Sequence, residues 1–126
     1  MNNNDKDKRL NVLVVDDNKW DMKLIQLYLK NHNIEITTAN NGFDAVDSVK
    51  KGNIDVVLMD IQMPVMDGFE ATKKIREFNS SIPIVAYTAL AITGDRQACL
   101  DAGFTDYISK PLYKEPLLKI LSNYIK

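Results

Sequence analysis

The sequence predicts an α/β fold in which a parallel sheet is covered by helices on both faces. Short apolar runs rich in β-branched residues recur along the 126-residue chain, and a helical pattern follows each of them. Most of these runs are nearly continuous rather than alternating, which is typical of strands buried on both faces of a parallel sheet. Strict alternation of strand and helix favours parallel strands joined by right-handed crossovers.

The five expected strands are short and are bounded by polar or turn-forming residues. They are predicted over residues 10–15, 34–38, 56–59, 82–87 and 107–108. In a doubly wound sheet of this kind all strands end at the same edge, and ligands bind just beyond those carboxyl ends. The residues that follow the strands are therefore the first place to look for function.

Helical periodicity fills the segments between the strands. A first helix is expected after Asn18, a second after Asn41 and a third after Asp67. The fourth is less regular and is expected to stop at Gly103, because glycine commonly ends helices. The last helix is expected to run to the end of the chain. Its apolar face consists of Leu117, Leu118, Leu121 and Ile125.

Composition indicates one ordinary domain, since 126 residues with 45% hydrophobic content can bury a core of single-domain size. The 16 basic and 17 acidic residues give a net charge of −1, which argues against direct binding of DNA or RNA. No apolar run approaches the roughly 18 residues of a membrane span. The single cysteine fits a reducing compartment. The sequence thus predicts a cytoplasmic domain over residues 10–126, after a disordered polar lead over residues 1–9.

Polar residues follow four of the five expected strands. In chain order they are Asp16 with Asp17, Asp60, Thr88 and Lys110. Each has an ordinary interpretation when taken alone: Asp17 or Thr88 could cap a helix, and Asp60 could stand in a turn. Lys110 could simply be a solvated charge.

The set is more informative than its members, because three carboxylates at one sheet edge repel each other. The repulsion is roughly 4 kcal/mol per close pair at an effective dielectric constant near 20. Lys110 supplies one positive charge, and Mg²⁺, which prefers carboxylates, waters and phosphate oxygens, would supply two. With the hydroxyl of Thr88, the set indicates a site for a phosphoryl group. One of the carboxylates could be its acceptor.

Four sequence blocks resemble the receiver domain of bacterial two-component response regulators and hybrid histidine kinases. They are residues 14–18, 58–68, 86–89 and 109–111. The resemblance extends from about residue 10 to residue 124, and it implies a flavodoxin-like (βα)5 sandwich with strand order 2-1-3-4-5. It also implies a signalling switch rather than an enzyme, although such a domain catalyses its own phosphorylation and autodephosphorylation.

The resemblance assigns the acceptor and the metal ligands. Asp60 would be the phosphoacceptor. Mg²⁺ would be bound by Asp17, by Asp60 and by the backbone carbonyl of Gln62, while Asp16 would act mainly through water.

The remaining roles concern the phosphoryl oxygens and the switch. Lys110 would pair with one phosphoryl oxygen, and Thr88 would donate a hydrogen bond to another. Tyr107 matches the aromatic position that turns inward on phosphorylation, and the Lys110–Pro111 peptide bond is expected to be cis. The output surface would be formed by the fourth helix, the fifth strand and the last helix.

The implied partner is a histidine kinase or a histidine phosphotransfer protein, which donates the phosphoryl group from a phosphohistidine. Trp20 and Leu27 lie beside the main apolar stripe of the first helix. Partial burial at the helix margin is the favoured interpretation of Trp20, and a docking contact for the donor protein is the alternative. The domain is expected to be a monomer or a weak homodimer.

Three other functions remain open at this point. A small Mg²⁺-dependent phosphatase with an aspartyl-phosphate intermediate would need a second carboxylate two positions after Asp60, where Gln62 stands. A flavin-binding carrier would need a hydroxyl-rich loop after the first strand, where two aspartates stand. A degenerate receiver that only binds proteins would have lost an acidic or lysine position, and all of them are present.

Overall fold

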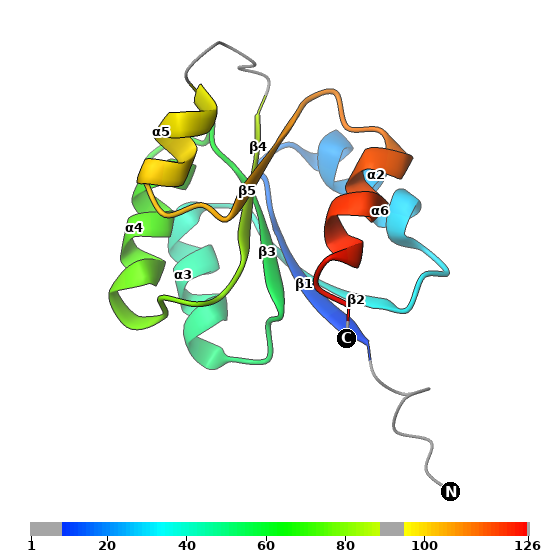
Figure 1. The fold of residues 1–126 in the computed structure, drawn as a ribbon, viewed down its shortest axis with the longest axis horizontal. Coiled ribbons are helices and arrows are strands. Elements are labelled where there is room, and N and C mark those ends of the chain that lie inside the picture. The colour runs from blue at the N-terminus through cyan, green and yellow to red at the C-terminus, as the bar shows by residue number, and fades with distance from the viewer. Residues whose placement is uncertain (1–8, 89–94, 126) are drawn as a thin grey trace, which may run out of the picture.

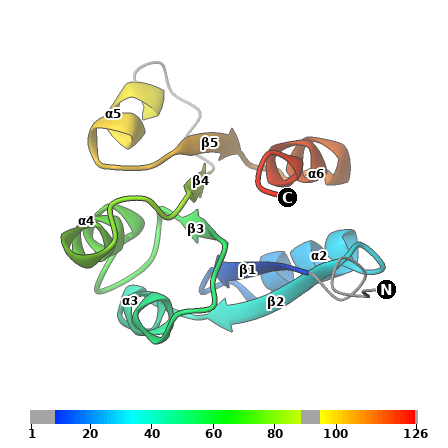
Figure 2. The same cartoon turned by 60° about the horizontal axis from the view of Figure 1, so that its bottom comes forward.

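The fold is a single parallel sheet between two layers of helices, and the computed structural model describes residues 9–88 and 95–125 of the chain (Figure 1). The strands are β1 (Leu10–Val15), β2 (Ile34–Ala39), β3 (Val56–Asp60), β4 (Ile84–Thr88) and β5 (Asp106–Ser109). All neighbouring strands pair in parallel, in the order β2-β1-β3-β4-β5 (Figure 2). The fold class and the strand order predicted from the sequence are confirmed.

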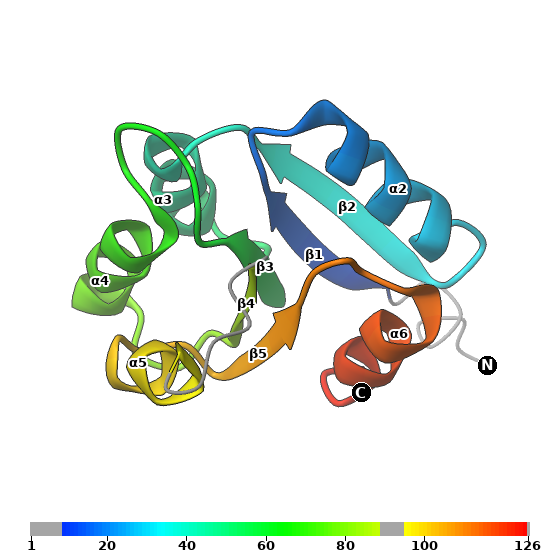
Figure 3. The same ribbon diagram turned by 90° about the horizontal axis from the view of Figure 1, so that it is seen from above.

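In the described part of the chain, five helices cover the two faces of the sheet. They are α2 (Lys19–Leu29), α3 (Gly42–Lys51), α4 (Gly68–Phe78), α5 (Asp95–Asp101) and α6 (Lys114–Ser122). Figure 3 shows α3, α4 and α5 on one side of the sheet and α2 with α6 on the other. None of the helices in the described part of the chain is long and apolar enough to cross a membrane.

Three helices begin where the sequence predicts, because a side chain caps each of them. The side chains of Asn18 and Asn41 accept hydrogen bonds from backbone N–H groups in the first turns of α2 and α3. Asp67 caps α4 in a reciprocal capping box with Glu70. Each cap satisfies N–H groups that have no partner within the helix, which fixes the point where the chain leaves the sheet edge.

The last helix is shorter than predicted. It ends at Ser122 rather than at the chain terminus, and Ile125 is 57% exposed. Leu117 and Leu121 are fully buried in the core beneath α2 and α6, whereas Ile125, one turn further along the same apolar face, is largely exposed. The apolar periodicity that extends to Ile125 therefore predicts a helix several residues longer than the observed one.

β1 has the predicted bounds, whereas β2 and β3 each end one residue later than predicted and β5 is one residue longer at each end. β4 begins at Ile84 rather than at residue 82, and Pro83, which has no N–H to donate to a ladder, lies just before it. β2 alternates between exposed and half-buried positions because it is an edge strand, and only Ala39 is buried. Gly103 follows α5 with a φ of 106°, as the predicted helix stop requires.

The central strands are buried on both faces, which makes the sheet edge a rigid platform. On β1, Leu13 and Val15 belong to the core beneath α3, α4 and α5, while Val12 and Val14 belong to the core beneath α2 and α6. All four side chains are fully buried. A strand held from both sides in this way presents the residue after its last core position in a fixed place.

Candidate functional site

The acidic residues predicted to meet at the sheet edge do meet there. Val15 and Met59 pair across β1 and β3, so the next residues, Asp16 and Asp60, lie side by side. One carboxylate oxygen from each of Asp16, Asp17 and Asp60 can be chosen so that all three lie within 4.8 Å of one another. Asp16 and Asp60 are each only 2% exposed, whereas Asp17 faces solvent. The three carboxylates form what we call the acidic cluster.

Lys110 directly follows β5 and reaches the acidic cluster from the end of that strand. Its Nζ lies 3.6 Å from Oδ2 of Asp60 and 3.8 Å from Oδ2 of Asp16. The Lys110 backbone N–H donates to the carbonyl oxygen of Thr88 at 2.8 Å, which ties the lysine to the end of β4. Thr88 is buried at that strand end. The Lys110–Pro111 peptide bond is cis, as the resemblance implies.

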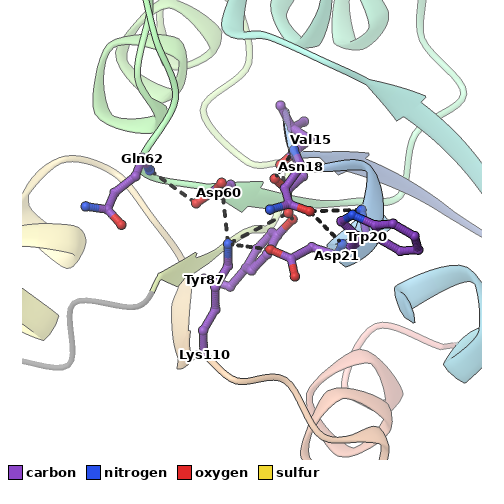
Figure 4. Close-up of polar contacts among 9 residues, drawn as sticks. Val15, Asn18, Trp20, Asp21, Asp60, Gln62, Tyr87 and Lys110 are labelled. Carbon is purple, nitrogen blue, oxygen red and sulfur yellow. Dashed lines mark hydrogen bonds and ion pairs between the residues drawn. The ribbon is translucent and has the colours of Figure 1, made fainter. Parts of the chain in front are cut away.

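The segment after β3 folds back onto the Asp60 carboxylate. The backbone N–H of Gln62 donates to Oδ1 of Asp60 at 3.1 Å, while the Gln62 side chain is exposed (Figure 4). The N–H of Gly68 donates to the carbonyl oxygen of Ile61 at 2.9 Å, which closes the loop between β3 and α4. The loop thus fixes one oxygen of Asp60 and leaves the other toward Lys110.

The acidic cluster carries more negative charge than the ammonium of Lys110 can balance. Burial, together with the neighbouring charge of Asp16, raises the pKa of Asp60 from 3.8 to about 7, although Lys110 and the Gln62 N–H act in the opposite direction. Burial alone would lower the pKa of Lys110, but the hydrogen bond to Asp21 and the charges of Asp60 and Asp16 raise it. One ammonium therefore does not balance the acidic cluster. A hard divalent cation fits both the charge and the oxygen ligands.

Tyr87 is a site residue that sequence reasoning missed. Its hydroxyl donates to Oδ2 of Asp16 at 2.5 Å, and it lies 3.4 Å from the carbonyl oxygen of Val15. Burial and the charge of Asp16 raise the pKa of Tyr87, so the hydroxyl stays protonated and keeps donating. A tyrosine in a fully buried strand needs a hydrogen-bond partner, and this requirement is the signal that could have identified it.

Asp21 is the second missed residue. Its Oδ2 accepts a hydrogen bond from Nζ of Lys110 at 2.9 Å, which is shorter than the distance from Nζ to either buried aspartate (Figure 4). The sequence carries no local signal for this contact, because the first turn of α2 and the loop after β5 are 89 positions apart.

Two further predicted residues lie outside the acidic cluster. Tyr107 is half-buried on β5 opposite Ala86 and packs against the core on the α5 side of the sheet. Trp20 is 80% exposed and Leu27 is 66% exposed, so the favoured interpretation of Trp20 as partly buried was wrong. On the same helix, Ile25 faces the sheet and is fully buried, whereas Trp20 and Leu27 point away from it.

The comparisons with known proteins agree with the geometry. The family model of the response regulator receiver domain matches residues 12–122. The sensor protein GacS of Pseudomonas syringae pv. syringae is 39% identical over 115 residues, which cover 87% of this chain. The chain spans only 13% of the length of that relative.

Solved structures give the same result. The receiver domain of sensor histidine kinase PA1611 from Pseudomonas aeruginosa, with a magnesium ion coordinated in its active site cleft, is 37% identical. It superposes with a TM-score of 0.85 over 94% of this chain and 98% of the other. The receiver domain of the response regulator Ssk1, in complex with the histidine phosphotransfer protein Ypd1 of Saccharomyces cerevisiae, is 32% identical. That match has a TM-score of 0.87 and covers 93% of this chain and 89% of the other.

Proposed function

The chain belongs to the response regulator receiver domain family, and from this premise we propose that Asp60 accepts the phosphoryl group of a phosphorelay. The observation that carries the assignment is the geometry at the strand ends. Asp60 is the acidic residue that lies within 3.6 Å of Lys110 and also has one oxygen fixed by the backbone of Gln62. Asp16 is committed to Tyr87, and Asp17 stands in solvent.

The acidic cluster fits Mg²⁺, as its excess of negative charge shows. Asp17, Asp60 and the backbone carbonyl of Gln62 would bind the ion, with Asp16 acting mainly through water. When bound, Mg²⁺ offsets the charge on the phosphoryl oxygens and on the attacking carboxylate. Tyr87 holds Asp16 in one orientation, and this leaves the exposed Asp17 as the carboxylate that is free to adjust.

Phosphoryl transfer then needs little from the protein beyond positioning and charge. The phosphorus–nitrogen bond of the phosphohistidine donor breaks as a phosphorus–oxygen bond to the Asp60 carboxylate forms. The Lys110 ammonium stabilises one oxygen of the phosphoryl group in the transition state, and the Thr88 hydroxyl donates a hydrogen bond to another oxygen once the group is bound to Asp60. Attack of water on the acyl phosphate reverses the modification, so the domain catalyses both its own phosphorylation and its autodephosphorylation.

The output follows from the position of Thr88 next to β5. β4 and β5 pair so that Thr88 lies opposite Ser109 and Ala86 opposite Tyr107. Movement of Thr88 toward a phosphoryl group opens space beside Tyr107, which turns inward and reshapes the surface formed by α5, β5 and α6. Inverting a strongly one-sided equilibrium takes about 5.5 kcal/mol, so a partial shift is expected.

The direct test is covalent modification of the purified protein. We expect acetyl phosphate and Mg²⁺ to add one phosphoryl group, seen by intact mass, and we expect EDTA to reduce the rate at least about 100-fold because the acidic cluster then repels the donor. Protein that stays unmodified with Mg²⁺ present would contradict the function. Modification that is as fast in EDTA would contradict the metal site alone.

Trp20 is the proposed contact for the phosphodonor protein. It lies in the first turn of α2, two residues after the cap Asn18 and close to the acidic cluster, and its side chain is 80% exposed. Leu27, two turns further along, is exposed as well. Exposed apolar side chains beside a reacting group favour an interface, because a buried aromatic anchor supplies much of the binding energy of such contacts.

We expect Trp20→Ala to raise the KM for a phosphorylated histidine phosphotransfer domain about 10- to 30-fold, the loss typical of an aromatic anchor. Modification by acetyl phosphate should be unchanged. Phe43→Ala is the matched control, since Phe43 is an exposed aromatic on α3, across the sheet. Trp20→Ala protein that takes the phosphoryl group from the donor protein with unaltered kinetics would remove the docking role.

The remaining proposals concern context. We place the domain in the cytoplasm as a monomer or weak homodimer that does not bind nucleic acid directly, in keeping with its net charge of −1. The phosphatase alternative is not favoured, because the position two residues after Asp60 carries the exposed amide of Gln62 rather than a carboxylate.

A further inference from the structure

Among the described residues, the Lys110 ammonium has three carboxylate neighbours, and it hydrogen-bonds to the one outside the acidic cluster. Its Nζ lies 2.9 Å from Asp21, against 3.6 Å from Asp60 and 3.8 Å from Asp16. The same nitrogen lies over the Tyr87 ring, 4.9 Å from the ring centroid. In Figure 4 the Lys110 side chain rises between Asp60 and Asp21, with its dashed contacts spread over both sides. Asp21 thus holds the lysine toward α2.

The sequence around α2 explains why the Asp21 carboxylate is available for this contact. Asp21 is the third residue of its helix, the position from which Glu70 in α4 reaches back to the N–H of its cap residue Asp67. In α2 the N–H of the cap residue Asn18 donates to Oδ1 of Asp16 at 2.8 Å instead. The Asn18 N–H is therefore already paired with Asp16, and the Asp21 carboxylate accepts from Lys110 instead.

We propose that Asp21 is a positioning residue that competes with the phosphoryl group for Lys110, an inference that rests on the function proposed above. Among the ion pairs of the described residues, those of Asp16 and Asp60 are made by Lys110 alone. A group arriving on Asp60 must therefore draw this ammonium away from Asp21. The Asp21 side chain is 34% exposed, so water can replace the lysine and the exchange is reversible.

The competition gives a definite sign to the effect of removing the charge. Asp21→Asn keeps the shape of the side chain and weakens its hold on the ammonium, so Lys110 becomes available to the incoming phosphoryl group. We expect modification of Asp60 by acetyl phosphate at saturating Mg²⁺ to become about three- to fivefold faster, in line with a partly exposed ion pair. Beryllium fluoride, a phosphoryl mimic, should bind correspondingly tighter by titration of the Trp20 fluorescence.

Two controls separate this mechanism from a general change of charge. Asp47→Asn removes the same charge from another lysine-paired aspartate, since Asp47 lies 3.2 Å from Lys51 on the surface of α3. This variant should behave as wild type. In a Lys110→Met background, Asp21→Asn should change neither the modification rate nor beryllium fluoride binding, because the residue through which Asp21 acts is gone.

The outcomes are distinct. Faster modification and tighter beryllium fluoride binding in Asp21→Asn, both lost in the Lys110→Met background, would establish the positioning role. An Asp21→Asn protein that is slower or unchanged would overturn it, and so would an acceleration that persists without Lys110. Wild-type protein that accepts no phosphoryl group would contradict the function itself, and the inference with it.

Discussion

Asp60→Asn should abolish covalent modification, so that intact mass shows no added phosphoryl group after prolonged incubation with acetyl phosphate and Mg²⁺. The amide has nearly the shape of the carboxylate, and the Gln62 N–H that donates to Oδ1 of Asp60 still finds an acceptor oxygen. What is lost is the anionic oxygen that attacks phosphorus. Asp47→Asn is the matched control, because it makes the same change at a surface carboxylate of α3 and leaves the acidic cluster intact. Modification of Asp60→Asn protein at the wild-type rate would show that another residue is the acceptor.

The same substitution should stabilise the metal-free protein at high pH. The pKa of Asp60 is raised to about 7 in the folded protein, so the folded state binds this proton more tightly than the unfolded state does. The free energy of unfolding should therefore fall as pH rises from about 4 to 7, and the full cost is present above pH 7. Asp60→Asn removes that cost, which predicts a gain of about 2 to 4 kcal/mol at pH 8.

Urea unfolding in EDTA at pH 5 and pH 8 measures this effect. Between pH 5 and pH 8, wild type should lose more stability than the Asp60→Asn protein does. The difference in stability between the two proteins at pH 8 should narrow when Mg²⁺ is added, because the ion then offsets the charge of Asp60. An Asp60→Asn protein that is less stable than wild type at pH 8 in EDTA would mean that the buried carboxylate is compensated by groups other than the metal.

The fold was predictable because its signals are local. Continuous apolar runs mark the buried strands, and a capping residue stands at each of the starts of α2, α3 and α4. The errors lie where tertiary surroundings decide. The stripe through Ile125 continues past the sheet that its helix covers, and β2 alternates because it lies at an edge. Neither the end of α6 nor the exposure of β2 is readable from periodicity alone.

The site was predictable only in the part that follows from topology. Residues directly after parallel strands meet at one edge, which brings Asp16, Asp60 and Lys110 together. Asp21 was missed because its contact joins a helix and a loop from opposite ends of the chain, and no spacing rule relates them. Tyr87 was missed because it ends the apolar run predicted as the fourth strand, although its hydroxyl required a partner.

Gly68→Ala should damage both stability and phosphoryl acceptance, because this glycine packs closely against the backbone of Asp60. A Cβ at Gly68 would lie 2.6 Å from the carbonyl oxygen of Asp60 and 2.8 Å from Cα of Ile61. Both atoms belong to the backbone and cannot rotate away, so the loop after β3 must shift. We expect the free energy of unfolding to fall by about 2 to 3 kcal/mol, the usual cost of overpacking.

The shift should also move the acceptor, since the Gly68 N–H holds the carbonyl oxygen of Ile61 at 2.9 Å, next to Asp60. A displacement of about 1 Å can slow a positioned reaction roughly 100-fold, so modification of the folded fraction should slow by at least about tenfold. Gly52→Ala is the control, because Gly52 has a φ of 86° with open space around it. That variant should lose about 1 kcal/mol of stability from backbone strain and keep the wild-type modification rate. Equal modification rates in the two variants would show that the close packing of Gly68 supports the fold without positioning Asp60.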